Sequence, residues 1–212
     1  MSSTRALGIL GGTFNPPHRG HLALALSARE QLGLERVLLV PAHTAPYKAG
    51  DVAGDVGPEH RLAMCRLAVA GSGALVVCAV EIERGGVSYT VDTLRELHAS
   101  HPEAELTLIV GADVASTLRS WREPAQLLAL AGLAIAERPG APRGPVLDTL
   151  AALHTEAGVR VSWLQMPAID ASSSLARARV ARGEPIEELV GPAVAGYIAE
   201  HGLYAVPSEA HV

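Results

Sequence analysis

Short apolar segments alternate with helical patterns along almost the whole sequence, and this alternation limits the fold more than any other feature. The apolar segments predict strands at 7–10, 37–40, 75–82, 106–110, 133–136 and 159–164. Helical patterns lie between them at 20–32, 59–70, 91–100, 125–131 and 146–157. Several strand segments are apolar without interruption, which is typical of parallel strands covered on both faces. We therefore expect a doubly wound, Rossmann-like α/β fold with a mostly parallel sheet.

The pattern changes after the last expected strand, where two helices are predicted at 173–182 and 187–201 without a further strand. We expect a single domain over residues 1–212. Within it, 1–168 form the α/β core, 169–204 form a C-terminal helical tail, and 205–212 form a flexible end. The irregular segment 41–58 follows a strand, and ligands of open α/β sheets bind beyond the carboxyl ends of the strands. This segment is therefore placed where a lid would lie.

Composition excludes several classes of function. The net charge of −5 argues against binding of nucleic acid or of an anionic membrane by the protein as a whole. No apolar run approaches the ~18 residues that a membrane span needs, and none suits a signal peptide. Cys65 and Cys78 form no CxxC pair and suggest neither a disulfide framework nor a zinc site. We expect a cytoplasmic protein whose partners are small molecules, and the sequence leaves open whether it forms a homo-oligomer.

The segment GGTFNPPHRGH, residues 11–21, joins the first expected strand to a helix. Gly11 and Gly12 allow a tight turn and close approach of a ligand to the backbone. His18 and His21 are three residues apart at the helix start and so share one face. Free N–H groups and imidazoles at a helix N-terminus favour an anion. A glycine pair before a helix is weak evidence alone, and a single exposed histidine is usually just solvated.

A second candidate phosphate site lies near the other end of the chain, where Ser172, Ser173 and Ser174 begin a helix and Arg177 follows. Ser172 or Ser173 could be an N-cap with nothing more implied. The same hydroxyls and N–H groups could instead hold a phosphate, with the Arg177 guanidinium adding a permanent charge.

Two further segments carry candidate acceptor-binding residues. GVSYTVDTL, residues 86–94, opens a helix with Tyr89 and Thr90, and Thr90 could simply be its N-cap. Asp113 closes another strand and Trp121 follows eight residues later. On residue type alone, Trp121 is more often a core residue.

These segments together resemble the signatures of the bacterial nicotinate-nucleotide adenylyltransferase family within the HxGH nucleotidyltransferases. The family motifs are GGTFxPxHxGH, ISSTxxR, SYTxDTL, GADxxxxLxxW and a closing YIxxHGLY, and the resemblance runs from Gly8 to about Tyr204. Asn15 stands where many members have Asp, Ala171 and Ser174 replace Ile and Thr, and Tyr47 replaces a His of the loop pattern PxxxPPHK.

The resemblance implies transfer of the adenylyl group of ATP to nicotinate mononucleotide, giving nicotinate adenine dinucleotide and pyrophosphate in NAD biosynthesis. It assigns catalysis to His18 and His21. The ATP-binding residues that it implies are Gly11, Gly12, Thr13, Phe14, His18, Gly20, His21, Ser172, Ser173, Ser174 and Arg177. The implied nicotinate-nucleotide-binding residues are His43, Lys48, Tyr89, Thr90, Asp113 and Trp121.

No carboxylate cluster is visible, so we expect Mg²⁺ to be held mainly by the nucleotide phosphates and no metal site in the chain itself. Two alternatives stay open. One is an adenylyltransferase for another acceptor, either nicotinamide mononucleotide or phosphopantetheine. The other is a nucleotide-binding protein without catalytic activity.

Overall fold

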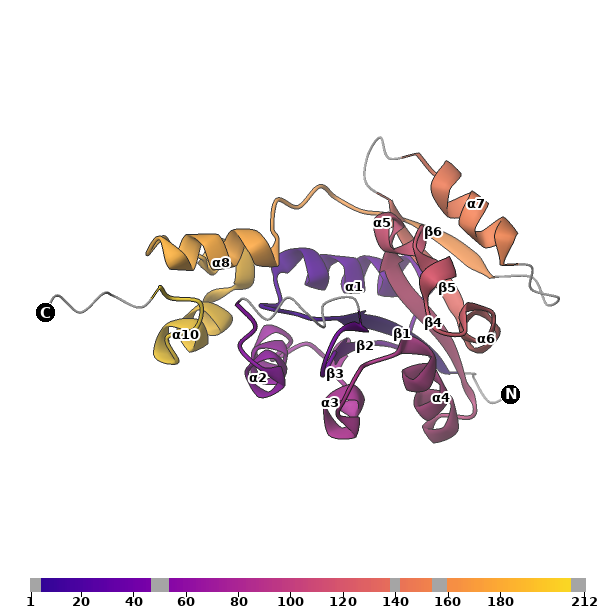
Figure 1. Cartoon of the computed structure of the whole chain (residues 1–212), viewed down its shortest axis with the longest axis horizontal. Coiled ribbons are helices and arrows are strands. Elements are labelled where there is room, and N and C mark those ends of the chain that lie inside the picture. The colour runs from indigo at the N-terminus through magenta and orange to yellow at the C-terminus, as the bar shows by residue number, and fades with distance from the viewer. Residues whose placement is uncertain (1–4, 47–53, 138–141, 154–159, 207–212) are drawn as a thin grey trace, which may run out of the picture.

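The computed structural model describes residues 5–46, 54–137, 142–153 and 160–206, and their strands form one parallel sheet (Figure 1). The strands are β1 (Arg5–Gly12), β2 (Arg36–Pro41), β3 (Leu75–Val77), β4 (Ala104–Gly111), β5 (Gly132–Glu137) and β6 (Val161–Gln165). Their order in the sheet is β3-β2-β1-β4-β5-β6, and every neighbouring pair is parallel. The doubly wound α/β prediction is confirmed, and chain order reverses between β1 and β4, where such sheets bind ligands.

Helices cover both faces of this sheet. They are α1 (Arg19–Leu32), α2 (Pro58–Ala68), α3 (Val80–Arg84), α4 (Thr90–Ser100), α5 (Ala112–Ala115), α6 (Pro124–Leu130) and α7 (Gly144–Ala152), with a 3₁₀ turn η2 (Leu118–Ser120). Side chains of α1 and α2 pack on one face of the sheet, and side chains of α4, α6 and α7 pack on the other. Figure 1 shows α1 and α4 on opposite sides. No helix in the described ranges combines the length and hydropathy that a membrane crossing requires.

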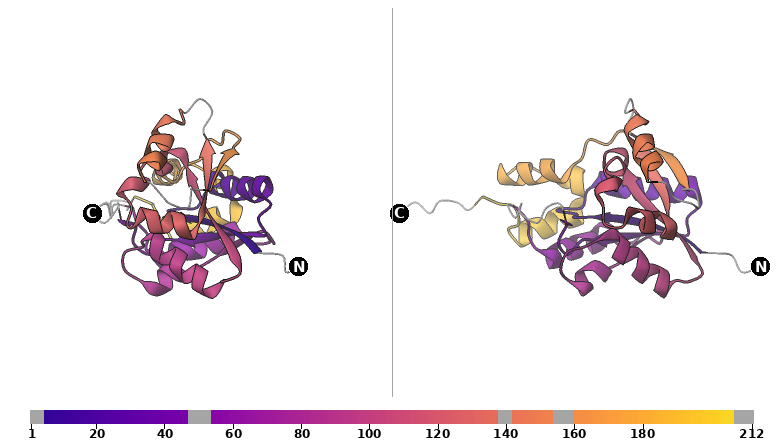
Figure 2. Two further views of the ribbon diagram at one scale, coloured as in Figure 1. Left: turned by 90° about the vertical axis from the view of Figure 1, so that its right-hand side faces the viewer. Right: turned by 45° about the vertical axis from the view of Figure 1, so that its right-hand side comes forward.

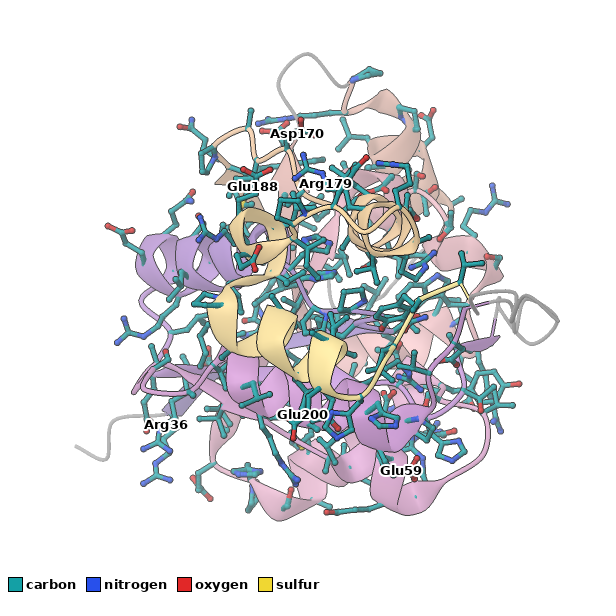
Figure 3. All side chains as sticks on the ribbon, turned by 90° about the vertical axis from the view of Figure 1, so that its left-hand side faces the viewer. Arg36, Glu59, Asp170, Arg179, Glu188 and Glu200 are labelled. Carbon is teal, nitrogen blue, oxygen red and sulfur yellow. The ribbon has the colours of Figure 1, made fainter. Side chains whose placement is uncertain are left out.

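The C-terminal helices α8 (Ser173–Ala181), α9 (Glu187–Val190) and α10 (Pro192–Glu200) lie beyond one end of the sheet (Figures 1 and 2). A separate apolar cluster joins them to α2 through buried Met64, Ala176 and Ile198. Arg179 of α8 also pairs with Glu188 of α9 (Figure 3). The helical tail is therefore packed against the α/β core.

Two expected elements are wrong in extent. The strand predicted over 75–82 stops at Val77, and α3 follows; within it, Glu81 is buried and accepts a hydrogen bond from the Thr93 hydroxyl. The helix predicted over 187–201 is divided at Gly191, whose φ of 86° cannot continue a helix. The end of the helix predicted over 146–157, part of the loop at 41–58 and residues 207–212 lie outside the described residues.

Gly8 of β1 is required by close packing around the strand rather than by an unusual backbone. A Cβ atom at this position would lie 2.8 Å from the Leu34 side chain, 2.9 Å from Ile109 and 3.0 Å from Val37. All three neighbours are buried in the core between the sheet and α1. Because interiors are densely packed, an added methyl group here forces its neighbours to move.

We predict that Gly8→Ala lowers the free energy of unfolding by ~1–3 kcal/mol, the usual effect of overpacking. Gly196→Ala is the matched control, since its added methyl group on α10 would meet no atom within 4 Å. In the control, the gain in helix propensity is expected to raise stability by ~0.5–1 kcal/mol. Urea denaturation measures both, and a Gly8→Ala protein as stable as the parent would contradict the packing argument.

Candidate active site

The turn after β1 brings His18 and His21 to the start of α1. Phe14 adopts a φ of 51°, and His18 is the N-cap residue of the helix. A Cβ atom on Gly20 would lie 3.0 Å from Cε1 and Nδ1 of the His18 ring. Glycine at this position thus makes room for the imidazole beside the first helical turn.

The two imidazoles lie against each other, with ring centroids 3.6 Å apart. The backbone N–H of His18 donates to Nδ1 of His21 over 3.2 Å, so a neutral His21 ring carries its proton on Nε2. Nδ1 of His18 is buried and has no hydrogen-bond partner among the described groups. Because buried polar atoms are normally hydrogen-bonded, this nitrogen is able to form a hydrogen bond with a bound ligand.

Burial keeps both rings neutral at physiological pH. Desolvation lowers the pKa of His18 to about 4, and desolvation together with the neighbouring His18 lowers the pKa of His21 to about 3. The pair therefore offers hydrogen-bond donors rather than fixed positive charges.

The start of α8 packs directly on this turn. The Ser173 hydroxyl donates to the carbonyl of Pro16 over 2.8 Å, and the Arg177 guanidinium donates to the carbonyl of Asn15 over 2.8 Å. Ser172 accepts a hydrogen bond from the N–H of Leu175, so of the two serines considered as an N-cap it is Ser172 that caps α8. The two candidate phosphate segments, far apart in sequence, thus lie next to each other.

Asn15 links this arrangement to two other segments. Its side-chain amide donates to the carbonyl of Gly54 over 2.8 Å, and its side-chain oxygen accepts from the Tyr204 hydroxyl over 2.6 Å. Burial raises the pKa of Tyr204, so the phenol stays protonated as a donor. A neutral amide can donate and accept at once, whereas a carboxylate at this position could only accept.

Arg61 of α2 is a residue of the site region that the sequence analysis missed. Its side chain is only 1% exposed, and it donates to the carbonyls of Thr13, Ala42 and His43 and to the Asp55 carboxylate. A single arginine in an amphipathic helix gives no sequence signal of this role, since most such residues are solvated.

A cavity of about 390 Å³ opens at the carboxyl ends of β1 and β4. The candidate site residues that line it are Gly11, Gly12, Thr13, His21, Tyr89, Thr90 and Trp121. The polar lining residues that were not predicted are Glu81, Ser88 and Arg122. The HxGH turn and the segments that carry Tyr89 and Trp121 therefore face one common space.

Other candidates lie around this cavity rather than in its wall. Phe14 is buried with its ring edge-on to His21, at 4.9 Å between centroids. The Asp113 carboxylate lies over Gly111 at the end of β4. His18, Gly20, Ser172, Ser173, Ser174 and Arg177 belong to the adjoining turn and α8.

The structure ties His43 to its neighbours through backbone hydrogen bonds. Its N–H donates to the Ser88 hydroxyl, and its ring Nδ1 lies 3.1 Å from the carbonyl of Gly86. The ring is thus held beside the 86–94 segment and is not among the cavity-lining groups. Lys48 and Tyr47 lie outside the described residues.

Thr90 and Trp121 each differ from the purely structural role that their residue type suggests. Thr90 is not the N-cap of α4, because Tyr89 is the N-cap and Thr90 is the first helical residue. Trp121 packs partly on the core and also lines the cavity, with its indole N–H donating to the Thr117 hydroxyl over 3.1 Å. The Trp121 ring therefore packs on the core and lines the cavity at the same time.

Comparison with known proteins places the chain in a family. Residues 9–179 match the family model described as Cytidylyltransferase-like. A Roseiflexus sp. (strain RS-1) protein named "probable nicotinate-nucleotide adenylyltransferase" is 45% identical, over 95% of this chain and 99% of its own length. A Herpetosiphon aurantiacus protein of the same name is 43% identical, over 93% of this chain and 98% of its own. The chain belongs to the nicotinate-nucleotide adenylyltransferase family.

Solved structures agree with this assignment at the level of the fold. The nicotinic acid mononucleotide adenylyltransferase of Plasmodium falciparum, solved in complex with APC, superposes with a TM-score of 0.74 at 18% identity. The superposition covers 94% of this chain and 97% of the other. The same Plasmodium protein has been solved with NaAD, again with a TM-score of 0.74. The doubly wound fold of this member of the nicotinate-nucleotide adenylyltransferase family is thus shared despite low identity.

We predict that His18 and His21 stay neutral between pH 7.5 and pH 5.5, because their pKa values lie near 4 and 3. Long-range ¹H–¹⁵N spectra should show His21 as the Nε2–H tautomer throughout. Below pH 6.5 the unfolded chain binds protons that the folded chain excludes, so these two groups lower the free energy of unfolding as pH falls toward 4. Protonation of either ring above pH 6 would contradict the role of burial.

Proposed function

We propose that this protein transfers the adenylyl group of ATP to the 5′-phosphate of nicotinate mononucleotide, giving nicotinate adenine dinucleotide and pyrophosphate. This is a step of NAD biosynthesis. The observation that carries the proposal is the HxGH turn, set between the start of α8 and a cavity lined by Tyr89 and Trp121. Its His18 Nδ1 has no hydrogen-bond partner in the described part of the chain. Membership in the family supports the same reaction.

The turn and α8 form the proposed ATP phosphate site. Gly11, Gly12 and Thr13 leave the backbone open to the nucleotide, and the free N–H groups of α1 favour an anion. Ser173 and Arg177 already lie at this turn, held by the carbonyls of Pro16 and Asn15. The guanidinium would contribute the permanent charge that the neutral imidazoles lack.

The cavity forms the proposed site for the pyridine nucleotide. Trp121 and Tyr89 present aromatic surface to a flat ring, and Thr90 lies at the first turn of α4. We assign Asp113 to the ribose and His43 to support of this segment. Lys48 is assigned to a substrate phosphate from the sequence alone.

The reaction needs positioning more than acid-base chemistry. A phosphate oxygen of nicotinate mononucleotide forms a bond to the α-phosphorus of ATP as the bond to the bridging oxygen breaks and pyrophosphate leaves. That nucleophile is already anionic at neutral pH, so no general base is required. His18 and His21 donate hydrogen bonds where negative charge develops, which is how phosphoryl transfer is usually stabilised.

Among the described residues, no group of three His, Cys, Asp or Glu side chains could hold a metal ion. We propose that Mg²⁺ reaches the site with the nucleotide phosphates, where it would neutralise their charge. A cytoplasmic location agrees with the free thiols of Cys65 and Cys78.

Pyrophosphate release with three acceptors in turn tests the proposal. Nicotinate mononucleotide is expected to give the highest kcat/KM, ahead of nicotinamide mononucleotide and phosphopantetheine. A higher value for phosphopantetheine would assign a different acceptor. ATP binding without turnover for any acceptor would indicate a protein without this catalytic activity.

We predict that His21→Ala lowers kcat by ~10²–10³, the loss typical of one donor that acts in the transition state. The KM values for both substrates should change much less. His98→Ala is a matched control, since His98 is exposed on α4 and is not among the residues that line the cavity. Near-normal turnover in the folded His21→Ala protein would remove His21 from catalysis.

A further inference from the structure

Arg122 is a cavity residue with no role in the reaction described so far. It follows Trp121 in sequence, lines the cavity, and its side chain is 50% exposed. Its guanidinium carbon lies 4.7 Å from the centre of the Tyr89 ring, a cation–π contact. Of the lining residues in the described part of the chain, only Arg122 carries a permanent positive charge.

The hydrogen-bonding capacity of Arg122 is only weakly used. Its nearest acidic atoms are Oδ2 of Asp92 at 3.4 Å and Oε1 of Glu123 at 3.7 Å. Both carboxylates bond more closely to Arg95, at 3.1 Å for Asp92 and 2.5 Å for Glu123. Arg95 thus serves as their main partner, and the Arg122 guanidinium keeps donors for another acceptor.

The groups beside Arg122 at the cavity wall are an aromatic ring and a helix start. The Arg122 guanidinium packs on the Tyr89 ring, and Thr90 lies at the positive end of α4. Glu81, the acidic lining residue, is buried and accepts a hydrogen bond from the Thr93 hydroxyl over 2.6 Å. Its carboxylate is therefore occupied within the protein.

We propose that Arg122 determines the preference for a pyridine carboxylate over a pyridine carboxamide. This inference rests on the proposed function. A guanidinium forms two parallel, charge-assisted hydrogen bonds with a carboxylate, whereas a carboxamide offers one acceptor and no charge. Arg122 acts on ground-state binding of the acceptor and takes no part in the transfer step.

The test is the ratio of kcat/KM for nicotinate mononucleotide to kcat/KM for nicotinamide mononucleotide in Arg122→Gln. This ratio should fall by about tenfold, the effect of losing a hydrogen bond to a charged group at a half-exposed site. The fall should come from a higher KM for the acid, while kcat and the KM values for the amide and for ATP stay within about twofold.

Arg119→Gln is the matched control. It makes the same change in charge at an exposed residue of η2, three positions away in sequence, but Arg119 does not line the cavity. Its acid-to-amide ratio should stay within about twofold of the parent value. Arg122→Lys, which keeps the charge and loses the planar fork, should give an intermediate ratio.

An unchanged ratio in Arg122→Gln would overturn the inference and assign selectivity to other groups. Equal losses with both acceptors, together with a raised KM for ATP, would also overturn it, because they indicate a structural role. If the parent protein turns over neither acceptor, the proposed function fails instead. Calorimetric binding of the two mononucleotides to parent and Arg122→Gln proteins then decides the inference by itself.

Discussion

The buried guanidinium of Arg61 fixes the carboxyl edge of the sheet on which the site is built. Burying a charged group is costly unless its donors are satisfied, and here they meet carbonyl oxygens of Thr13, Ala42 and His43 and the carboxylate of Asp55. Those carbonyls belong to the turn after β1 and to the chain just after β2. The Arg61 guanidinium therefore sets the spacing between the ends of β1 and β2. The HxGH turn follows β1 directly, so its position depends on this contact.

The second constraint is the contact between that turn and α8. Asn15 and Pro16 use their backbone carbonyls to receive Arg177 and Ser173, while the Asn15 side chain receives the hydroxyl of Tyr204. The C-terminal helices thus complete the proposed phosphate side of the site from the opposite end of the sequence. Their apolar cluster with α2, which also carries Arg61, makes both halves of the site depend on the same helix.

Sequence patterns predicted the central strands well because the middle residues of β1, β2, β4 and β5 are mostly buried and apolar. They failed where a polar side chain is buried for a specific partner: Glu81, inside the strand predicted to 82, is a buried residue of α3, and Arg61 looks in sequence like any solvated arginine of an amphipathic helix. Motif spacing brought out the turn, the start of α8 and Trp121. It could not predict Arg122, because an arginine next to a tryptophan is not a distinctive sequence pattern. Only the fold shows that the Arg122 guanidinium packs on the Tyr89 ring.

The distribution of charge across the site has a mechanistic consequence. Permanent positive charge lies at two places in the proposed site, with Arg177 beside the HxGH turn and Arg122 at the cavity wall, whereas burial keeps His18 and His21 neutral. Only interactions that are stronger in the transition state than with the bound substrates raise kcat. Neutral donors held rigidly at a helix start gain strength as charge develops on the phosphate oxygens, so their contribution is greatest in the transition state.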